Sequence, residues 1–529
     1  LGAELLRGWM AGWQVFMNMF ILGWVGMAMG KVANMAFGWP LWVGLVIPTT
    51  ITAIYTLAAG YWGVVMGDFL QGIVAVFAIV LVSLVGIAAA GGPAGVAHGL
   101  ANLGQEWRLN AFAFTGWLTG DFPAAWWITM LVIAVIGGFG MGTSIDWYAE
   151  AQRIQSARTV RDASYGIWAG GAMTLIRNAF WGASIVAFFV LMPHITSTAD
   201  AEMGWYRMGF ELLPMGLAGV FFGAVLAIHL STISSHLNLG ALYFTRDLYQ
   251  RYINPQASER ALVWCGRIAT AVLLVGSFFY GLMMKEITQW LIFALWLMMA
   301  GIWLPNILQV VWWRFNAWGY LASWIANLGI AWLVVWVLPA FHVLPVLPDH
   351  LQFWLLMALG AVVFLPATLL TAPERMDHLV KYYVMTRPIG WWGPVHDEAV
   401  RRGLVSSSNS SSNSTSSSSS TATHRPLIRR QWTPEEADSW SREDWIAIVL
   451  SPLVYAFVLI GLARLLLGMA DGGLMLLAGI VLAGVMYWVI DPKLRAVSEE
   501  YEEKQAAYLV ELERKLRWQD ERAATQEGS

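Results

Sequence analysis

The chain has 529 residues, of which 58% are hydrophobic and only 12% are charged. A soluble domain carries about twice that charged share, so the composition excludes an ordinary soluble protein and indicates a multi-pass membrane protein. The net charge of -3 comes without a long basic stripe, which argues against a nucleic-acid partner, and the single Cys265 excludes an internal disulfide and a cysteine metal cluster.

The chain starts with "LGAELLRGWMAGW", which has no initial methionine and lacks the apolar core of a signal peptide, so we expect a sequence truncated at its N-terminus. A membrane-spanning helix needs about 20 apolar residues, and about twelve segments qualify. They lie near residues 9–34, 40–62, 69–91, 125–147, 165–193, 214–240, 260–283, 286–311, 318–340, 350–371, 444–468 and 473–491. The sequence therefore predicts an all-α polytopic protein in the lipid bilayer.

Basic residues in the loops predict the orientation, because they remain on the cytoplasmic side. Three arginines lie in the loop 148–164 and three in the loop 246–260, and the long loop 372–443 carries many more basic residues. The intervening loops carry few. This alternation predicts a multi-pass protein of the plasma membrane with both ends of the chain in the cytoplasm.

The predicted organisation has four parts, which are a transmembrane core at 1–371, a cytoplasmic loop at 372–443, two transmembrane helices in 444–491 and a charged tail at 492–529. Within the loop, the Ser-rich segment 405–424 has the low complexity of a disordered linker. Asn409 and Asn413 begin Asn-X-Ser/Thr triplets there, but a cytoplasmic position argues against glycosylation. The tail is interpreted as a solvated helix, with pairing to another helix as the alternative.

The first polar feature is Asp68 in "YTLAAGYWGVVMGDFLQG", at the head of the third apolar segment, with Gln71 one turn later. A carboxylate at a helix N-terminus is stabilised by the helix dipole and can face water at the membrane boundary. A deeper acid marks a functional site instead. The residues alone leave both interpretations open.

Residues 133–148, "IAVIGGFGMGTSIDWY", interrupt a hydrophobic span with four glycines, two hydroxyls and one acid. Broken helices in transporters free backbone groups to hold substrate and ions, although small residues also permit tight helix packing. We favour a break. In the next segment, Arg177 requires a partner such as Asp146, a backbone carbonyl or an anionic substrate, unless it extends to the membrane surface.

The stretch "HLSTISSHLN", residues 229–238, places four hydroxyls within five positions of an apolar segment. Neutral hydroxyls and backbone carbonyls suit hard cations such as Na⁺. Each hydroxyl can instead bond to the carbonyl one turn earlier, but four together favour ion binding. His229 and His236 are interpreted as hydrogen-bonding partners of other helices, with a proton-sensitive role as the alternative.

Three stretches together resemble the sodium:solute symporter family. "YTLAAGYWGVVMGDFLQ" matches its pattern of Tyr-Thr, small residues and an acid, "AEAQRIQSARTVRDASYG" matches its Gln-Arg loop, and "HLSTISSHLNLGALYFTRDLYQRYI" matches its hydroxyl-bearing helix. They occur in the family's order, and the resemblance covers residues 10 to about 311. It implies an inverted-repeat transporter with alternating access, in which this chain begins at the third core helix and lacks the first ones.

The resemblance also implies site residues. The family's sodium site corresponds to the Ser231 and Thr232 hydroxyls and the Ile228 carbonyl. A second ion site, found in some members, corresponds to Asp68, Ser234 and Ser235. The substrate pathway corresponds to Gly140, Thr143, Ser144, Asp146, Thr174 and Arg177. Several of these differ from the residues of the family's sugar carriers, which argues against glucose or galactose as the solute.

We therefore expect a sodium-coupled secondary active symporter that imports a small organic solute, with Na⁺ as the coupling ion, no cofactor and no enzymatic activity. Proton coupling is the alternative within this class. A non-transporting membrane sensor would need a signalling domain, and only a short charged segment follows residue 491. A membrane enzyme would need a clustered nucleophile and base. The sequence leaves the solute and the oligomeric state open.

Overall fold

The structure, a computed structural model, consists of α-helices joined by mostly short connections. It describes residues 2–110, 113–120, 122–138, 152–195, 197–284, 286–292, 298–386, 388–405 and 441–497. Within these residues, nine helices are long and apolar enough to cross a membrane. The predicted all-α, multi-pass architecture is therefore confirmed.

The nine candidate spans are α1 (Gly2–Phe37), α2 (Leu41–Ala89), α6 (Val160–Leu191), α9 (Met215–Leu242) with η2 (Tyr243–Ile253), α10 (Glu259–Met283), α13 (Ala317–Trp332) with η4 (Leu333–Val337) and α14 (Leu338–Ala340), α15 (Asp349–Leu370), α19 (Arg442–Leu466) and a last helix, Gly472–Val497. The shorter helices are α3 (Gly92–Asn102), η1 (Glu106–Leu109), α4 (Ala124–Gly138), α7 (Thr198–Ala201), α8 (Gly204–Leu212), α11 (Ile287–Leu291), α12 (Met298–Val311), α16 (Met376–Thr386) and α17 (Gly393–Arg401).

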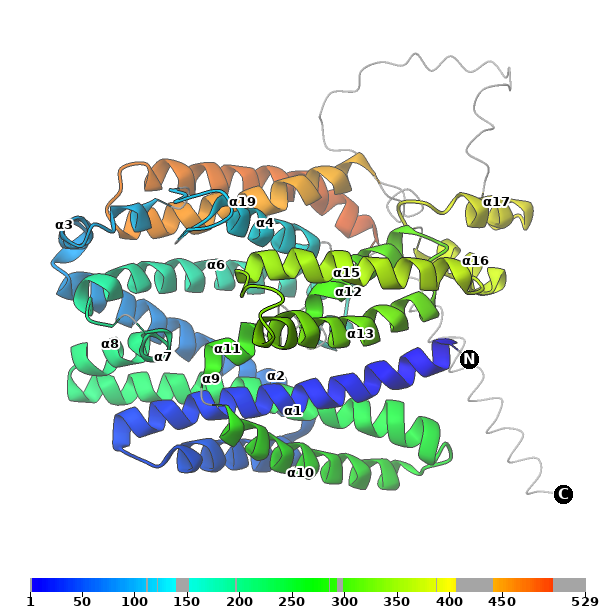
Figure 1. Ribbon diagram of the computed structural model, residues 1–529, viewed down its shortest axis with the longest axis horizontal. Coiled ribbons are helices and arrows are strands. Elements are labelled where there is room, and N and C mark those ends of the chain that lie inside the picture. Colours follow the sequence, from blue (N-terminus) through cyan, green and yellow to red (C-terminus); the bar gives the residue numbers. More distant parts are fainter. Residues whose placement is uncertain are drawn as a thin grey trace, which may run out of the picture.

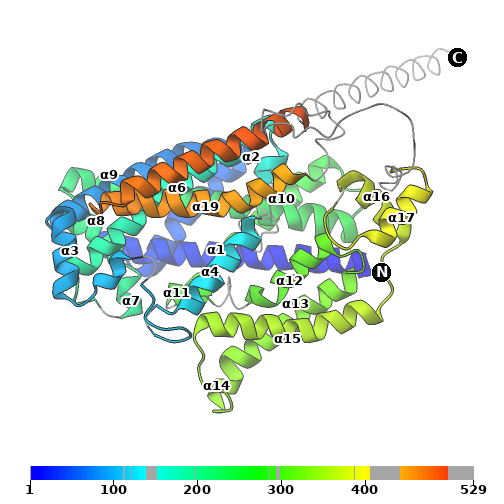
Figure 2. The same cartoon turned by 90° about the horizontal axis from the view of Figure 1, so that it is seen from above.

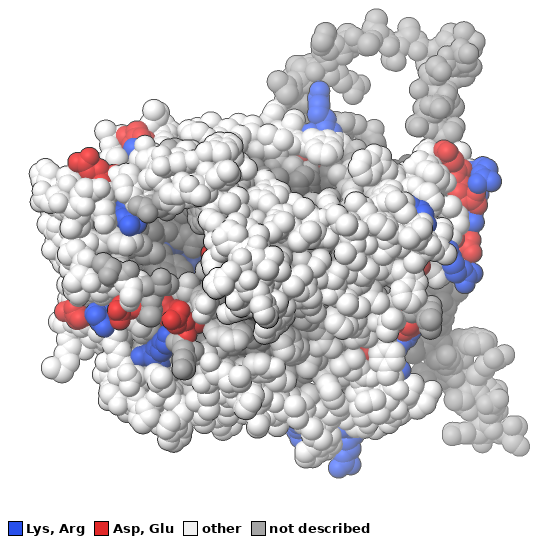
Figure 3. All heavy atoms as spheres, viewed as in Figure 1, with Lys and Arg blue, Asp and Glu red and all other residues white. Residues whose placement is uncertain are grey.

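The long helices lie side by side along the longest axis of the molecule (Figures 1 and 2). On the face shown in Figure 3, lysine, arginine, aspartate and glutamate side chains gather mainly toward the two ends of this axis, and the surface between them is mostly uncharged. Charged side chains are costly in the hydrocarbon core, which is about 30 Å thick. The long axis is therefore the expected direction of the membrane normal.

Side-chain caps begin several of these helices. Thr159 accepts a hydrogen bond from the Asp162 backbone N–H at the start of α6, and Asn316 accepts one from the Gly319 N–H at the start of α13. Each cap satisfies a backbone donor that has no partner inside the helix. The sequence thus sets where these helices enter the bundle.

Helix α1 passes through the bundle and is the most buried of the described spans. Its Trp13 packs on Trp324 of α13, with ring centroids 4.8 Å apart, in a core cluster that also contains Phe364 of α15. Gly23 allows α10 to approach closely, because a Cβ at this position would lie 2.7 Å from the Ser277 carbonyl oxygen. Close packing at small residues is a main source of helix association in membranes.

Helix α2 is broken at Gly60, where φ is 62° and ψ is -162°. This conformation is essentially restricted to glycine. A straight helix of this length would extend about 70 Å, more than twice the hydrocarbon thickness. The break divides α2 into a first arm that ends before Gly60 and a second arm that follows it.

Both arms of α2 reach the same end of the bundle. Gly44 of the first arm packs against Ala33 near the end of α1, and Gly86 of the second arm packs against Met208 of α8. Helices α1 and α8 meet there in one apolar cluster. The first arm therefore corresponds to the predicted segment 40–62. The second arm begins at residue 61, ahead of the predicted start at 69, so Asp68 lies about two turns inside this helix and not at its head.

Other predicted segments include residues that the structure does not describe. Segment 125–147 begins as α4, and its remainder falls within residues 139–151, which lie outside the described residues. Segment 286–311 contains α11 and α12 on either side of residues 293–297, which are also not described. Nearly all of the predicted Ser-rich linker and charged tail lies outside the described residues as well.

Several helices extend further than the hydropathy predicts: α6 begins at Val160 and not at 165, the last helix ends at Val497 and not at 491, and α1 and α9 are extended where they lie together. Helix α1 begins ahead of the predicted segment, and η2 continues α9 to Ile253, so the prediction of a loop from residue 246 is wrong for its first turns. The reason is pairing between the two extensions. Arg7 Nη2 lies 2.7 Å from Asp247 Oδ1, and Arg251 forms an ion pair with Glu4.

Candidate functional site

A polar cluster lies where the second arm of α2 packs on α9. Asp68 is mostly buried, with 14% of its side chain exposed. The Ser231 hydroxyl donates to Asp68 Oδ1 at 2.5 Å, and the Ser235 hydroxyl donates to Asp68 Oδ2 at 3.1 Å. The two serines share one face of α9 because they are four residues apart. One carboxylate and two hydroxyls thus converge on a single point inside the bundle.

Arg153 completes this group, which we name the Asp68 cluster (Asp68, Arg153, Ser231 and Ser235). Its Nη2 lies 2.5 Å from Asp68 Oδ2 and 2.9 Å from Ser235 Oγ. The side chain of Arg153 is 32% exposed, so this residue lies at the edge of the cluster. The ionic contact compensates the charge of Asp68, which is costly to bury alone.

The backbone of Arg153 is held beside the break in α2. The Ser156 hydroxyl donates to the Arg153 carbonyl at 2.9 Å, and the Ser156 and Tyr61 hydroxyls lie 3.1 Å apart. Tyr61 directly follows Gly60, so this contact ties the break in α2 to the residues next to the short helical stretch 152–155 that carries Arg153. The sequence pattern does not mark Arg153 as a site residue, although its Gln-Arg pair lies in one of the stretches that resemble the family.

The other two hydroxyls of the stretch bond within α9. The Thr232 hydroxyl donates to the Ile228 carbonyl at 3.2 Å, and the Ser234 hydroxyl donates to the Ser231 carbonyl at 3.0 Å. Both follow the back-bonding alternative. The structure therefore groups Ser231 with Asp68 and places Ser234 outside the cluster, whereas the family resemblance implies the opposite grouping for these two serines.

Gln71 adds an amide group one turn after Asp68. Its Oε1 is buried and, among the described residues, has no hydrogen-bond partner. Buried polar atoms are normally paired, and an ordered water or a cation can satisfy such an acceptor. Gln71 Oε1 is thus a further oxygen, one helical turn from Asp68, that can accept a hydrogen bond or bind a cation.

His229 and His236 link α9 to other helices, as predicted. His236 Nδ1 lies 2.8 Å from Asn18 Oδ1 of α1, and His229 Nε2 lies 3.3 Å from Thr49 Oγ1 of α2. Both histidines are buried, with 3% of each residue exposed. In the part of the chain that the structure describes, there is no group of three His, Cys, Asp or Glu side chains arranged to hold a metal ion.

The predicted substrate residues are divided between described and undescribed segments. Gly140, Thr143, Ser144 and Asp146 lie outside the described residues. On α6, Thr174 is half-buried and Arg177 is exposed. Arg177 Nε lies 3.3 Å from Asn178 Oδ1, and Asn178 donates in turn to the Tyr455 hydroxyl of α19 at 3.0 Å. Arg177 therefore lies where α6 meets α19.

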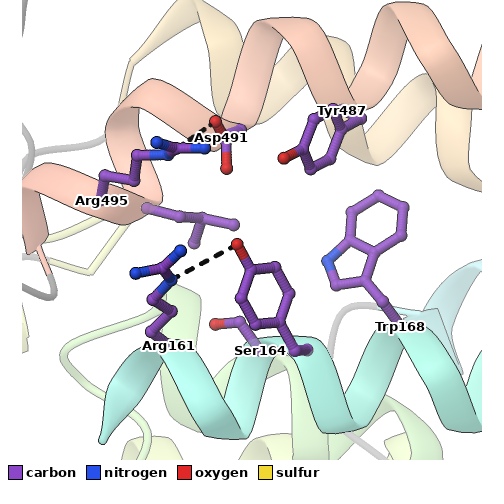
Figure 4. Close-up of a pocket in the computed structure, with 8 residues that line it drawn as sticks. Arg161, Ser164, Trp168, Tyr487, Asp491 and Arg495 are labelled. Atoms are coloured by element: carbon purple, nitrogen blue, oxygen red, sulfur yellow. Dashed lines mark hydrogen bonds and ion pairs between the residues drawn. The ribbon is translucent and has the colours of Figure 1, made fainter.

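A cavity of about 120 Å³ lies between α6 and the helix Gly472–Val497 (Figure 4). Trp168 and Tyr487 line it together with an ion pair in which Arg495 Nε is 2.9 Å from Asp491 Oδ2. Aromatic rings beside charged groups are typical of the membrane–water interface. None of the lining residues belongs to the predicted ion or substrate sets. The Asp68 cluster, rather than this cavity, is therefore the candidate ion site.

A second ionic link lies near the other end of α1. Lys31 Nζ is 2.6 Å from Glu202 Oε2, and the Thr288 backbone N–H donates to Glu202 Oε1 at 2.7 Å. Burial raises the pKa of the Glu202 carboxyl, but the hydrogen bonds from Lys31 and Thr288 outweigh burial and hold this pKa below its usual value. Glu202 thus ties α1 and α11 to the connection between α7 and α8.

Comparison with known proteins adds a family match. A model of the Sodium:solute symporter family matches residues 2–327. The chain is 27% identical to the Osmoregulated proline transporter OpuE of Bacillus subtilis over 311 residues, which cover 58% of this chain and 60% of that protein. It is 23% identical to the Sodium/glucose cotransporter 4 of Danio rerio over 455 residues, which cover 74% of this chain and 65% of that protein. The chain thus spans less than two thirds of either relative.

The fold is similar to a solved structure of a Na⁺-coupled sialic acid symporter in a substrate-bound, outward-open state. The TM-score is 0.55 at 17% sequence identity, and the match covers 71% of this chain and 76% of that chain. At such an identity the likeness concerns the fold alone.

Proposed function

This chain belongs to the sodium:solute symporter family, and from that premise we propose that it is a sodium-coupled secondary active symporter that imports a small organic solute. Proteins of this family are transporters and not enzymes. In the proposed cycle, the Na⁺ gradient drives solute entry while an inverted-repeat helix bundle exposes the binding sites to each side of the membrane in turn.

The single observation that carries the proposal is the Asp68 cluster. An acid inside an apolar helix bundle is costly, and such acids mark ion pathways. Asp68, Ser231 and Ser235 supply the carboxylate and hydroxyl oxygens that hard cations take as ligands. We assign one Na⁺ site to these three residues. Ser234 joins this site only when its hydroxyl turns away from the Ser231 carbonyl.

A second Na⁺ site is proposed around the Thr232 hydroxyl and the Ile228 carbonyl. These two groups lie 3.2 Å apart on a side of α9 where Ile228 is 38% exposed. Ser231 lies between the two sites and can contribute to either. A hydroxyl and a carbonyl without a fixed charge suit a monovalent cation that must leave again in each transport cycle.

The solute is proposed to bind beside the interrupted segment at residues 133–148. Gly140, Thr143, Ser144 and Asp146 are the proposed contacts on that segment, and Thr174 and Arg177 are the proposed contacts on α6. The names of the relatives include proline and glucose, so amino acids and sugars are the first solute classes to test. An anionic or zwitterionic solute would give Arg177 a charged partner.

The proposed location is the plasma membrane, with both ends of this chain in the cytoplasm. The start of α1 and the end of η2 lie together, and Arg7, Arg246 and Arg251 line a shared recess there. Basic residues at one end of the helices favour the cytoplasmic side.

The test is solute-dependent entry of radiolabelled Na⁺ into liposomes that contain the purified protein. A panel of amino acids, sugars and carboxylates is supplied outside, and protein-free liposomes provide the background. We expect at least one solute to accelerate Na⁺ entry. Solute entry that follows a pH gradient and ignores Na⁺ would assign the coupling to protons instead. Absence of solute entry under either gradient would favour the sensor alternative.

A further inference from the structure

We infer that Arg153 is an internal cation that competes with Na⁺ for the Asp68 cluster, so that the ion binds only after the guanidinium leaves. The inference rests on the proposed function and concerns the regulation of the same site. On this account the ion pair between Arg153 and Asp68 must break before Na⁺ can bind.

The geometry shows that Arg153 uses the oxygens that a cation would need. A single nitrogen, Arg153 Nη2, contacts both Asp68 Oδ2 and Ser235 Oγ, at 2.5 and 2.9 Å. A Na⁺ ion placed between these two oxygens would overlap the guanidinium. Ser231 holds the other carboxylate oxygen, Oδ1, at 2.5 Å. Both oxygens of the acid are therefore engaged while Arg153 is in place.

The charge balance of the cluster also argues against Na⁺ and the Arg153 guanidinium binding Asp68 at the same time. The Asp68 carboxylate carries one negative charge, and the two serine hydroxyls are neutral. Counted over these four side chains, the cluster is neutral with Arg153 in contact and carries one positive charge when Arg153 and Na⁺ are both present. Like charges at this separation repel strongly in a mostly buried site. Na⁺ and the guanidinium are thus alternatives for one carboxylate.

The proposed exchange moves the Arg153 side chain while its backbone stays in place. Its backbone is tied through Ser156 to Tyr61 at the break in α2, and Asp68 belongs to the same arm of that helix. The Arg153 side chain is 32% exposed, so part of this side chain already borders solvent. Long arginine side chains readily place their charged group at a polar boundary while the stem stays in place.

A purely structural ion pair predicts the opposite response to mutation. If Arg153 only stabilised Asp68, its removal would leave a buried charge without compensation and would loosen the site. If Arg153 competes with Na⁺, its removal frees Asp68 and tightens Na⁺ binding. The direction of the change in Na⁺ affinity therefore distinguishes the two roles.

The experiment measures equilibrium binding of radiolabelled Na⁺ to the purified protein and to the variants Arg153→Gln and Arg153→Lys. Arg153→Gln is expected to lower the half-saturating Na⁺ concentration about tenfold if the guanidinium closes the site in about nine molecules of ten. Arg153→Lys keeps a competing cation and should remain much closer to the unsubstituted protein. An unchanged or raised half-saturating concentration in a folded Arg153→Gln protein overturns the inference.

A second measurement uses the unsubstituted protein, so it does not depend on the folding of a variant. Phenylglyoxal modifies exposed guanidinium groups, and peptide mass spectrometry reports its reaction at Arg153. Na⁺ should increase this modification relative to K⁺ at the same ionic strength, because the ion displaces the guanidinium. Equal modification in the two salts, at Na⁺ concentrations that saturate binding, overturns the inference.

The failure of this inference can be distinguished from failure of the proposed function. If the unsubstituted protein binds no Na⁺, both are overturned. If it binds Na⁺ and Asp68→Asn weakens binding while Arg153→Gln does not tighten it, only the role of Arg153 is overturned. In the double variant Asp68→Asn with Arg153→Gln, the effect of the arginine change should disappear, because the competition requires the carboxylate.

Discussion

The Ser231 hydroxyl donates a hydrogen bond of 2.5 Å to Asp68 Oδ1 and joins two positions that are 163 residues apart in the chain. Ser235 adds a second bond to the same carboxylate from the same face of α9. Hydrogen bonds to an ionised acceptor are about twice as strong as neutral ones. The pair therefore both orients the second arm of α2 on α9 and builds the proposed ion site.

The Ser231 hydroxyl bonds to Asp68, whereas the Ser234 hydroxyl bonds within α9, and this difference leads to a prediction with a matched control. Ser231→Ala is expected to raise the half-saturating Na⁺ concentration at least about tenfold, because a hydrogen bond or ligand to a charged group contributes about 1.5–3 kcal/mol. Ser234→Ala removes the same group from a buried position of the same helix, but its hydroxyl bonds to a backbone carbonyl, so a smaller change is expected. Na⁺-dependent binding or uptake gives the measurement. Equal effects of the two substitutions would refute the grouping.

The break in α2 predicts a backbone effect that does not depend on packing. Gly60→Ala is expected to lower the free energy of unfolding by about 1–3 kcal/mol, because an L-residue is strained at this φ and ψ. No atom lies within 4 Å of an added Cβ at Gly60 or at Gly72 of the same helix. Gly72→Ala is the control and should be neutral or stabilising by up to about 1 kcal/mol. Thermal unfolding in detergent measures both, and similar losses would contradict the strain argument.

The Glu202 link predicts a pH dependence of stability. The pKa of this carboxyl is lowered in the folded protein, so its stabilisation is fully present above its usual value of 4.5 and is lost as the pH falls through the lowered value. Glu202→Gln should remove this acid-dependent part and cost about 1–3 kcal/mol near neutral pH, because Lys31 loses its partner. Glu211→Gln, which changes an exposed acid in the neighbouring α8, is the control. If the free energy of unfolding changes with pH in the same way in the unsubstituted and Glu202→Gln proteins, the proposed stabilising role of the Glu202–Lys31 contact is contradicted.

The sequence predicts the helices and the polar stretch of α9 because both depend on local patterns. Apolar length locates the spans, and four hydroxyls at helical spacing mark the ion-binding stretch. Which hydroxyls face Asp68 depends on the rotation of α9 against α2, and tertiary packing sets that rotation. For this reason the positions of Ser231 and Ser234 relative to the carboxylate appear only in the structure.

Two features depend on contacts between distant residues and escape sequence analysis. Arg153 follows a segment of irregular pattern, so its reach to Asp68 cannot be derived from spacing. The extensions of α1 and η2 contain the charged pairs formed by Arg7 with Asp247 and by Glu4 with Arg251, which lower their apparent hydropathy. A prediction from hydropathy ends the helix at such charged residues, whereas in the structure the ion pairs stabilise its continuation.

The central claim, that Asp68 is a ligand of the coupling ion, is tested most directly by equilibrium binding of radiolabelled Na⁺ in the absence of solute. The comparison is between the unsubstituted protein and Asp68→Asn, which keeps the size of the side chain and removes its charge. Asp162→Asn, a change of an exposed acid at the start of α6, is the control. We predict saturable Na⁺ binding that Asp68→Asn weakens at least about tenfold and Asp162→Asn leaves unchanged. Equal Na⁺ affinity of the Asp68→Asn and unsubstituted proteins would contradict the claim.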